Sequence, residues 1–228
     1  MPWLDKIDAR DKIRWSDKRC DHYNKIIFPP PPETSSVPAD FNYPEPAEDW
    51  TPITHKQLVQ AICKLSALKA PGPDGIANIV FKKCPVLIDR LLPIFNAAIQ
   101  LDTYYDPWRK STTVIIRKPG KPDYTILKAY RPITLLNTTV KLLSALIADR
   151  VSFILETHNL LSSTHFGGQP GHSTTDSLHL LETTIRHTWQ QGKVVSALFL
   201  DIEGAFPNAV TDWLIHNMRT QRLPPRNN

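Results

Sequence analysis

The chain has 228 residues, of which 41% are hydrophobic, so it can bury a sizeable core and is not disordered as a whole. Its 27 Lys and Arg residues outnumber 22 Asp and Glu, an excess that suits a nucleic-acid or phosphate partner but occurs in many enzymes. Its three cysteines are too widely spaced for a disulfide framework or a zinc site, and no apolar run approaches the ~20 residues that cross a bilayer. We therefore expect an intracellular protein of the cytoplasm and nucleus, with no membrane partner.

Residues 1–50 are rich in proline, charge and aromatic rings, as in "FPPPPETSSVPADFNYPEPAEDW". Proline lacks the backbone N–H and fixes φ, so this composition sustains neither a long helix nor a central strand. We predict an extended linker that leads into the folded part of the chain. The tetraproline is also compatible with a ligand for an SH3-type domain.

Residues 51–192 show mostly helical patterns. The first predicted helix opens with a capping box, Thr54 and Gln57, and its apolar side chains recur at helical spacing up to Leu68. It stops at "APGPDG", which lacks the Gly-Lys-Ser/Thr ending of a phosphate-binding loop and is interpreted as a structural turn. The further predictions are helices in "IANIVFKKC", "VLIDRLLPIFNAAIQ", "TVKLLSALIADRVSFILETH" and "HSTTDSLHLLETTIRHTWQQ", and a strand in "TTVIIRK".

Residues 193–228 begin with an apolar run, Val194–Leu200, that predicts a buried strand ending at Asp201. A turn around Gly204 and a helix from about Pro207 should follow. Charged groups seldom end a buried strand without a partner. Asp201 is therefore either a turn former or a ligand of a divalent ion that is aligned on substrate phosphates.

Basic side chains gather around the Pro-Gly turn that follows the strand in "TTVIIRK". Arg117, Lys118 and Lys121 surround the turn, and Arg131 follows ten residues after Lys121. Two basic arms that leave a strand could grip a triphosphate, lysine as a point charge and arginine as a planar fork. On residue type alone, a solvated hairpin tip explains these residues better than a triphosphate site does.

Four segments, taken in order, resemble successive motifs of the reverse transcriptase of non-LTR (LINE-type) retrotransposons. They are "KAPGPDGI", "KPGKPDYTILKAYRPITLLNTTVKLLSALIADRV", "FGGQPGHSTTDSLHLLE" and "ALFLDIEGAFPNAV". The resemblance implies an α+β fold, mostly helical with a few strands, which forms the fingers and a partial palm of a right-hand polymerase. Residues 51–192 would be the fingers-like helical region and residues 193–228 the start of the palm. The implied activity is RNA-directed DNA polymerisation from an RNA template, a DNA primer and deoxynucleoside triphosphates.

The resemblance also assigns roles in the fingers. Lys118, Lys121 and Arg131 fall in the finger strands that cover the incoming triphosphate. The segment Gly167–Thr174 matches the motif that links fingers to palm, near the template strand. This chain has Gln169 and His172 there, where the family usually carries basic residues, so we expect weaker template contact.

In the palm, Asp201 matches the first catalytic aspartate, a ligand of both magnesium ions of the family enzyme. The carbonyl of Ile202 would be a further metal ligand. Phe206 matches the aromatic residue under the sugar, where a ring excludes a 2′-hydroxyl.

The second catalytic element of the family, which contains Ala-Asp-Asp, does not occur in the sequence. We therefore expect a truncated reverse transcriptase that is catalytically incomplete by itself. Two alternatives remain open: a non-catalytic module that binds nucleic acid, and a fragment of an intron-maturase-type polymerase.

Overall fold

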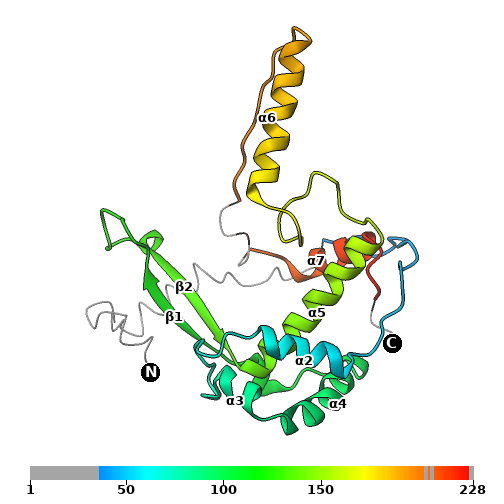
Figure 1. Cartoon of the computed structure of the whole chain (residues 1–228), viewed down its shortest axis with the longest axis vertical. Helices are drawn as coiled ribbons and strands as arrows, with labels where there is room; N and C mark the ends of the chain where they lie inside the picture. The colour runs from blue at the N-terminus through cyan, green and yellow to red at the C-terminus, as the bar shows by residue number, and fades with distance from the viewer. Residues whose placement is uncertain (1–35, 203–204, 206–207, 226–228) are drawn as a thin grey trace. The chain divides into compact units, whose positions relative to one another are not determined.

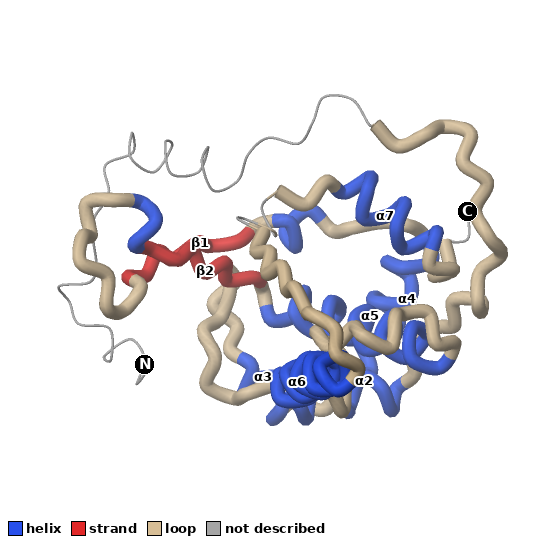
Figure 2. Tube along the Cα trace, turned by 90° about the horizontal axis from the view of Figure 1, so that it is seen from above, coloured by secondary structure: helices blue, strands red, loops and turns tan. Residues whose placement is uncertain are grey.

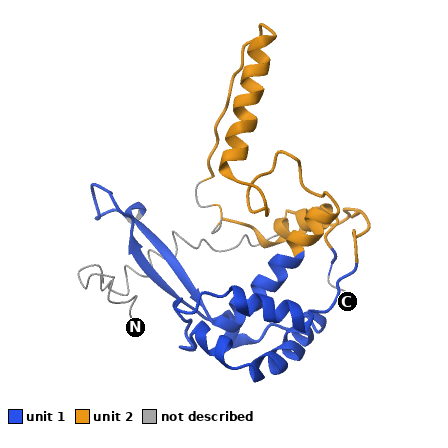
Figure 3. Cartoon of the chain, viewed as in Figure 1, with its two compact units in different colours: residues 1–27, 49–150, 224–228 blue, residues 28–48, 151–223 orange. Residues whose placement is uncertain are grey.

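The structure, a computed structural model, describes residues 36–202, 205 and 208–225. In this part, the chain divides into two compact units, shown in Figure 3. Unit 1 contains residues 49–150 and 224–225, and unit 2 contains residues 36–48, 151–202, 205 and 208–223. The architecture is mixed, with helices in both units and a small two-stranded sheet in unit 1.

The helices of unit 1 agree closely with the sequence patterns. They are α2 (His55–Lys64), α3 (Asn78–Lys83), α4 (Val86–Gln100) and the larger part of α5 (Thr138–Thr157). Both halves of the predicted capping box form at α2, because the Thr54 hydroxyl accepts from the Gln57 N–H and the Gln57 side chain accepts from the Thr54 N–H. The helix ends at Lys64, one turn before the last apolar residue of the pattern.

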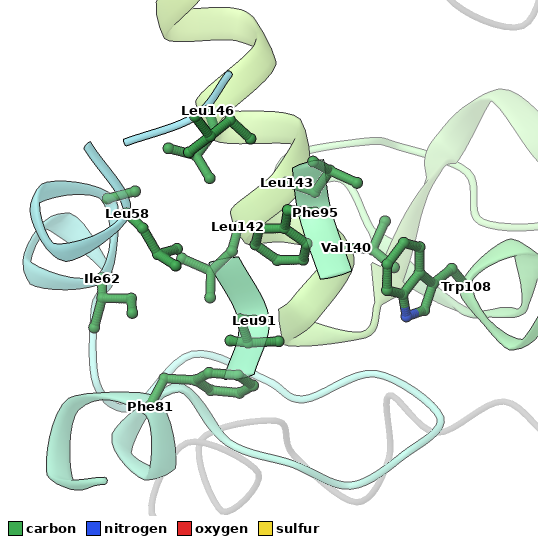
Figure 4. Close-up of a cluster of buried hydrophobic side chains, with 12 residues drawn as sticks. Leu58, Ile62, Phe81, Leu91, Phe95, Trp108, Val140, Leu142, Leu143 and Leu146 are labelled. Atoms are coloured by element: carbon green, nitrogen blue, oxygen red, sulfur yellow. The ribbon is translucent and has the colours of Figure 1, made fainter. Parts of the chain in front are cut away.

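The core of unit 1 lies where these helices meet, as Figure 4 shows. Leu58 of α2, Phe95 of α4 and Leu142 of α5 are fully buried there. Trp108 closes one side of the cluster, with its ring edge-on to Phe95 at a centroid distance of 6.1 Å. The apolar stripes of helices from distant parts of the sequence thus form one core, as their periodicity requires.

A long β-hairpin extends away from this helical body, as Figures 1 and 2 show. It follows the short 3-10 helix η2 (Asp106–Arg109) and consists of β1 (Ser111–Arg117) and β2 (Tyr130–Leu136), with η3 (Leu127–Ala129) before β2. The strands are antiparallel, with Ser111 opposite Leu136 at the base and Arg117 opposite Tyr130 near the tip. The strand in "TTVIIRK" is confirmed, whereas the residue pattern alone did not predict β2, because Pro132 interrupts it.

Unit 2 contains the end of α5, α6 (Thr174–Gln190) and α7 (Thr211–Thr220). Ser173 and Asp176 form a reciprocal capping box at the start of α6, as their residue types favour. No residue of the described helix α6 is buried. In the part of the chain that the structure describes, no helix is long and apolar enough to span a membrane.

Residues before α2 pack against α7 within unit 2. The Tyr43 hydroxyl lies 2.9 Å from Nδ1 of His216, and the Arg219 guanidinium lies 3.8 Å from the centroid of the Tyr43 ring. Phe41 and Trp213 also meet the His216 ring edge-on, at centroid distances of 4.7 and 5.1 Å. This aromatic clasp holds a segment without helix or strand onto a helix.

The predicted strand over Val194–Leu200 is wrong. Residues 193–202 form neither helix nor strand, and most of their apolar side chains are exposed. A strand needs a partner for its backbone N–H and C=O groups, and the sheet found in the described residues contains only β1 and β2. The helix predicted from about Pro207 begins at Thr211, while Pro207 itself and the turn at Gly204 lie outside the described residues.

Candidate nucleic-acid interface

The hairpin concentrates positive charge. Residues 111–136 contain five basic side chains and one acidic one, a net charge of +4 in a chain whose net charge is +5. The basic residues are Arg117, Lys118, Lys121, Lys128 and Arg131. The matching of potentials that steers a polyanion to a protein requires such a local excess rather than a high overall charge.

Hydrogen bonds within the tip fix Lys118 in place. Its backbone N–H donates to the Ala129 carbonyl at 2.8 Å, which continues the ladder beyond β1. Its ammonium group donates to the Lys128 carbonyl at 2.9 Å, and its own carbonyl accepts from the Tyr124 hydroxyl at 2.9 Å. An ammonium group has three N–H donors, so Lys118 keeps donors for a phosphate while its position is held.

The connection between the strands is ordered by a second set of contacts. The Asp123 carboxylate accepts from the N–H of Thr125 at 2.7 Å and from its hydroxyl at 2.8 Å. Both bonds hold the pKa of Asp123 below its usual value, and the bond from the backbone N–H has the larger effect. Tyr130 donates its hydroxyl to the Tyr124 carbonyl at 2.8 Å. The tip is thus a structured loop that presents its cations in defined places.

Strand alternation brings Lys118 and Arg131 to one face of the hairpin. Arg131 lies opposite Ile116, and Lys118 follows Ile116 by two residues, directly after the end of β1, so an extended backbone at Lys118 puts both basic side chains on the same side. Diagonal neighbours of this kind are ~7 Å apart, which two oxygens of one polyphosphate can span. Lys121 is exposed beside Gly120, whose φ of +74° makes the turn.

Arg117 points to the opposite face of the hairpin from Arg131. The sequence alone did not distinguish its role from that of Lys118 and Lys121. Its guanidinium carbon lies 5.0 Å from the centroid of the Tyr124 ring. Tyr124 in turn meets Tyr130 edge-on. Arg117 therefore takes part in the packing of the hairpin tip. The signal in the sequence that could have indicated this role is the pair of tyrosines, Tyr124 and Tyr130, that follows Arg117.

The predicted palm residues lie in unit 2. Asp201 and Ile202 are exposed, and Phe206 lies outside the described residues. Among the residues that the structure describes, no three His, Cys, Asp or Glu side chains lie close enough to hold a metal ion. The Asp201 carboxylate is an oxygen ligand of the type that magnesium takes, but the described residues do not fit a two-ion site.

Comparison with known proteins bears directly on the hairpin and on Asp201. Residues 116–227 match the family model for reverse transcriptase (RNA-dependent DNA polymerase). The chain is 34% identical over 169 residues to a probable RNA-directed DNA polymerase from transposon BS of Drosophila melanogaster, which covers 74% of this chain and 18% of that protein. It is 34% identical over 157 residues to the corresponding protein from transposon X-element, covering 68% of this chain and 17% of that protein.

A more distant relative is the RNA-directed DNA polymerase from mobile element jockey of Drosophila melanogaster. It is 26% identical over 175 residues, which cover 76% of this chain and 19% of that protein. The chain therefore matches about a fifth of the length of these relatives.

The matched residues define part of a reverse transcriptase domain. That domain is homologous to the RNA-directed DNA polymerases of non-LTR retrotransposons, which confirms the resemblance seen in the four motifs.

Proposed function

We propose that the chain forms the fingers and the start of the palm of a right-hand polymerase that copies RNA into DNA. The single observation that carries this proposal is the basic hairpin, whose charged tip lies within the residues matched by the reverse transcriptase family. The substrates would be an RNA template, a DNA primer and deoxynucleoside triphosphates inside the cell, in cytoplasm and nucleus.

In this proposal Lys118, Lys121 and Arg131 contact the phosphates of the incoming nucleotide. The shared face of Lys118 and Arg131 supports this role, because a lysine and an arginine on one side combine a point charge with a planar donor fork. Lys121 is in the loop between the strands, where its exposed ammonium group can approach a phosphate without moving the backbone.

Asp201 is proposed as the palm carboxylate, with the Ile202 carbonyl beside it and Phe206 under the sugar. Magnesium, when bound, would neutralise charge on the reacting phosphate. The described residues supply one exposed carboxylate at this place and no cluster. This observation favours a second candidate function for the chain by itself, namely nucleic-acid binding without catalysis.

The salt dependence of RNA binding tests the role of the hairpin. We compare the chain with a variant in which Lys118, Lys121 and Arg131 are all replaced by alanine. Each neutralised phosphate contributes about 0.7 to the slope of log K against log salt for single strands, so the variant should lose about 2 from the slope. The matched control replaces Lys56, Lys83 and Arg90, which are exposed on α2, α3 and α4, and should keep the slope. Equal slopes for the chain and the hairpin variant would refute the assignment.

Primer extension on an RNA template separates the two candidate functions. We expect no extension by the chain alone, with magnesium or manganese, because the one carboxylate that the described residues place there cannot hold two ions against water. Extension by the chain but not by Asp201→Ala would show that Asp201 works in a complete site, and the non-catalytic alternative would be wrong.

A further inference from the structure

Asn137 lies at the base of the hairpin, between the end of β2 and the start of α5. Its buried side chain accepts a hydrogen bond at Oδ1 from the N–H of Asp74 at 3.2 Å. Its Nδ2 donates to the carbonyl of Pro107 in η2 at 3.4 Å. One amide group therefore connects the end of β2, the segment that precedes β1 and the "APGPDG" loop.

Gly72 of the same loop touches the backbone at this point. A Cβ on Gly72 would lie 2.4 Å from the carbonyl carbon of Leu136 and 2.4 Å from the backbone nitrogen of Asn137. Those atoms belong to the junction of β2 and α5, so they cannot move aside without moving the strand. The close approach of the two backbones requires glycine here.

Further hydrogen bonds fasten the loop to the first turns of α5. The Lys141 ammonium group donates to the Ala70 carbonyl at 2.9 Å. The fully buried Thr138 hydroxyl donates to the Ile76 carbonyl at 2.9 Å and lies 3.0 Å from Oδ1 of Asn78. Buried polar groups that are paired in this way rigidify the segments that they join.

The strands of the hairpin receive less support from the helical body. The four residues at the base of β1, Ser111–Val114, are exposed, and Ile133 on β2 is exposed as well. The half-buried residues of β1 lie nearer the tip, where Tyr124 and Tyr130 pack. The hairpin extends from the helical body as an arm that is joined to it at the base, as Figure 1 shows.

We propose that Gly72 and Asn137 are positioning residues, which fix the direction of the hairpin and thereby place Lys118, Lys121 and Arg131 for nucleotide contact. The part that concerns the nucleotide rests on the function proposed above. The part that concerns direction can be tested without any ligand.

The test uses pulsed electron paramagnetic resonance to measure the distance between two spin labels. One label is on Cys63 of α2 and the other is on the cysteine introduced by Pro122→Cys in the hairpin loop. Cys63 is exposed, and Cys20 and Cys84 are replaced by serine so that only the two chosen positions react. We compare the full chain with its Gly72→Ala variant. The single distance peak of the parent should be lost and replaced by a broad distribution, while circular dichroism shows that the helices remain.

Gly75→Ala is the matched control, since it makes the same change three residues further along the same loop. Gly75 has a φ of +69°, so alanine there is strained, but its added Cβ would meet nothing within 4 Å. It should lower stability and keep the distance peak. Broadening in both variants would mean that general destabilisation moves the hairpin, and the proposal would be wrong.

A second pair of variants tests Asn137 in case Gly72→Ala does not fold. Asn137→Leu removes both hydrogen bonds at similar volume, whereas Asn137→Asp keeps an acceptor for the Asp74 N–H. We expect a broad distribution for the first and a retained peak for the second. A folded Asn137→Leu variant with the parent's narrow peak would overturn the role of Asn137.

The two proposals fail in different ways. If Gly72→Ala broadens the distance while the hairpin triple variant keeps its salt slope, the positioning stands and the nucleotide-contact role fails. If the slope falls as expected while Gly72→Ala keeps the narrow peak, the hairpin binds nucleic acid and the positioning proposal fails.

Discussion

The exposed apolar segment in residues 193–202 should make the chain self-associate. Four of its side chains, Val194, Leu198, Phe199 and Leu200, are 91%, 82%, 79% and 83% exposed. Full burial of such a side chain contributes about 1.5–3 kcal/mol, so covering the exposed fractions of all four would contribute roughly 5–10 kcal/mol. Association itself costs at least about 4 kcal/mol, which leaves at most about 6 kcal/mol. That upper limit corresponds to a dissociation constant no tighter than roughly tens of micromolar.

Sedimentation velocity over a concentration series checks this prediction. The parent should change from monomer to larger species as its concentration rises from tens of micromolar upward, and a Leu198→Lys, Leu200→Lys double variant should stay monomeric. The control replaces Leu68 and Leu101 of unit 1, which are 69% and 70% exposed, with lysine and adds the same charge. The control should associate like the parent.

Two results would refute the reasoning. One is a parent that remains a monomer at these concentrations and does not change when Leu198 and Leu200 are replaced. The other is a control variant that loses association to the same degree as the segment variant, because net charge rather than this segment would then decide the outcome.

Three further predictions concern stability. Phe95→Ala should lower the free energy of unfolding by about 3–5 kcal/mol in chemical denaturation, since the ring is fully buried in the core of unit 1. A loss below about 1 kcal/mol, far less than this range, would contradict the buried position of the ring. The Ser173 hydroxyl, and to a smaller extent the Ser173 N–H, donate to the Asp176 carboxylate and lower its pKa below 3.8. The stabilisation that these bonds give to the start of α6 is therefore present above pH 3.8 and is lost as the pH falls through the folded pKa. Protection of the amides in the first turn of α6 against exchange, relative to their intrinsic rates, should therefore fall in acid. Ser173→Ala should reduce this extra pH dependence, because only the backbone N–H of residue 173 then still donates to Asp176. Burial lowers the pKa of Lys141 below 10.5, so the unfolded chain binds more protons there and stability should rise as the pH increases toward that value. Lys141→Met should flatten this rise in denaturant titrations, and an unchanged rise would exclude Lys141 as its source.

Local signals in the sequence predicted much of the fold. The capping residues Thr54 and Ser173 begin their helices as expected, because a cap satisfies donors only a few residues away. Helix α4 coincides with its apolar pattern even though Pro93 lies inside it. The strand predicted from the apolar run Val194–Leu200 does not form, because an apolar pattern indicates burial but does not show whether a partner strand is present.

The candidate site was predictable by residue type but not by arrangement. Lys118 and Arg131 share a face only through the register that pairs Ile116 with Arg131, and a twelve-residue connection (residues 118–129) does not specify that register. The structural turn at "APGPDG" is confirmed by the bond from the Gly75 N–H to the Gly72 carbonyl. The contact of this turn with Asn137 was not predictable from the sequence. The hydrogen bond from Asp74 to Asn137 joins residues that are 63 positions apart.

The aromatic clasp has a consequence for the order in which the protein can assemble during translation. Tyr43 and His216 are 173 residues apart in the sequence, and so Tyr43 leaves the ribosome long before its partner exists. At about 5–20 residues per second, the wait is roughly 9–35 s, much longer than a helix needs to form. Through that interval Phe41 and Tyr43 have no ring of α7 to pack against, and a chaperone or another nascent chain can reach them first. Unit 2 therefore closes late, and a ribosome pause before Trp213 would prolong the exposure of this segment, whereas the α2 and α4 contacts of unit 1 can form meanwhile.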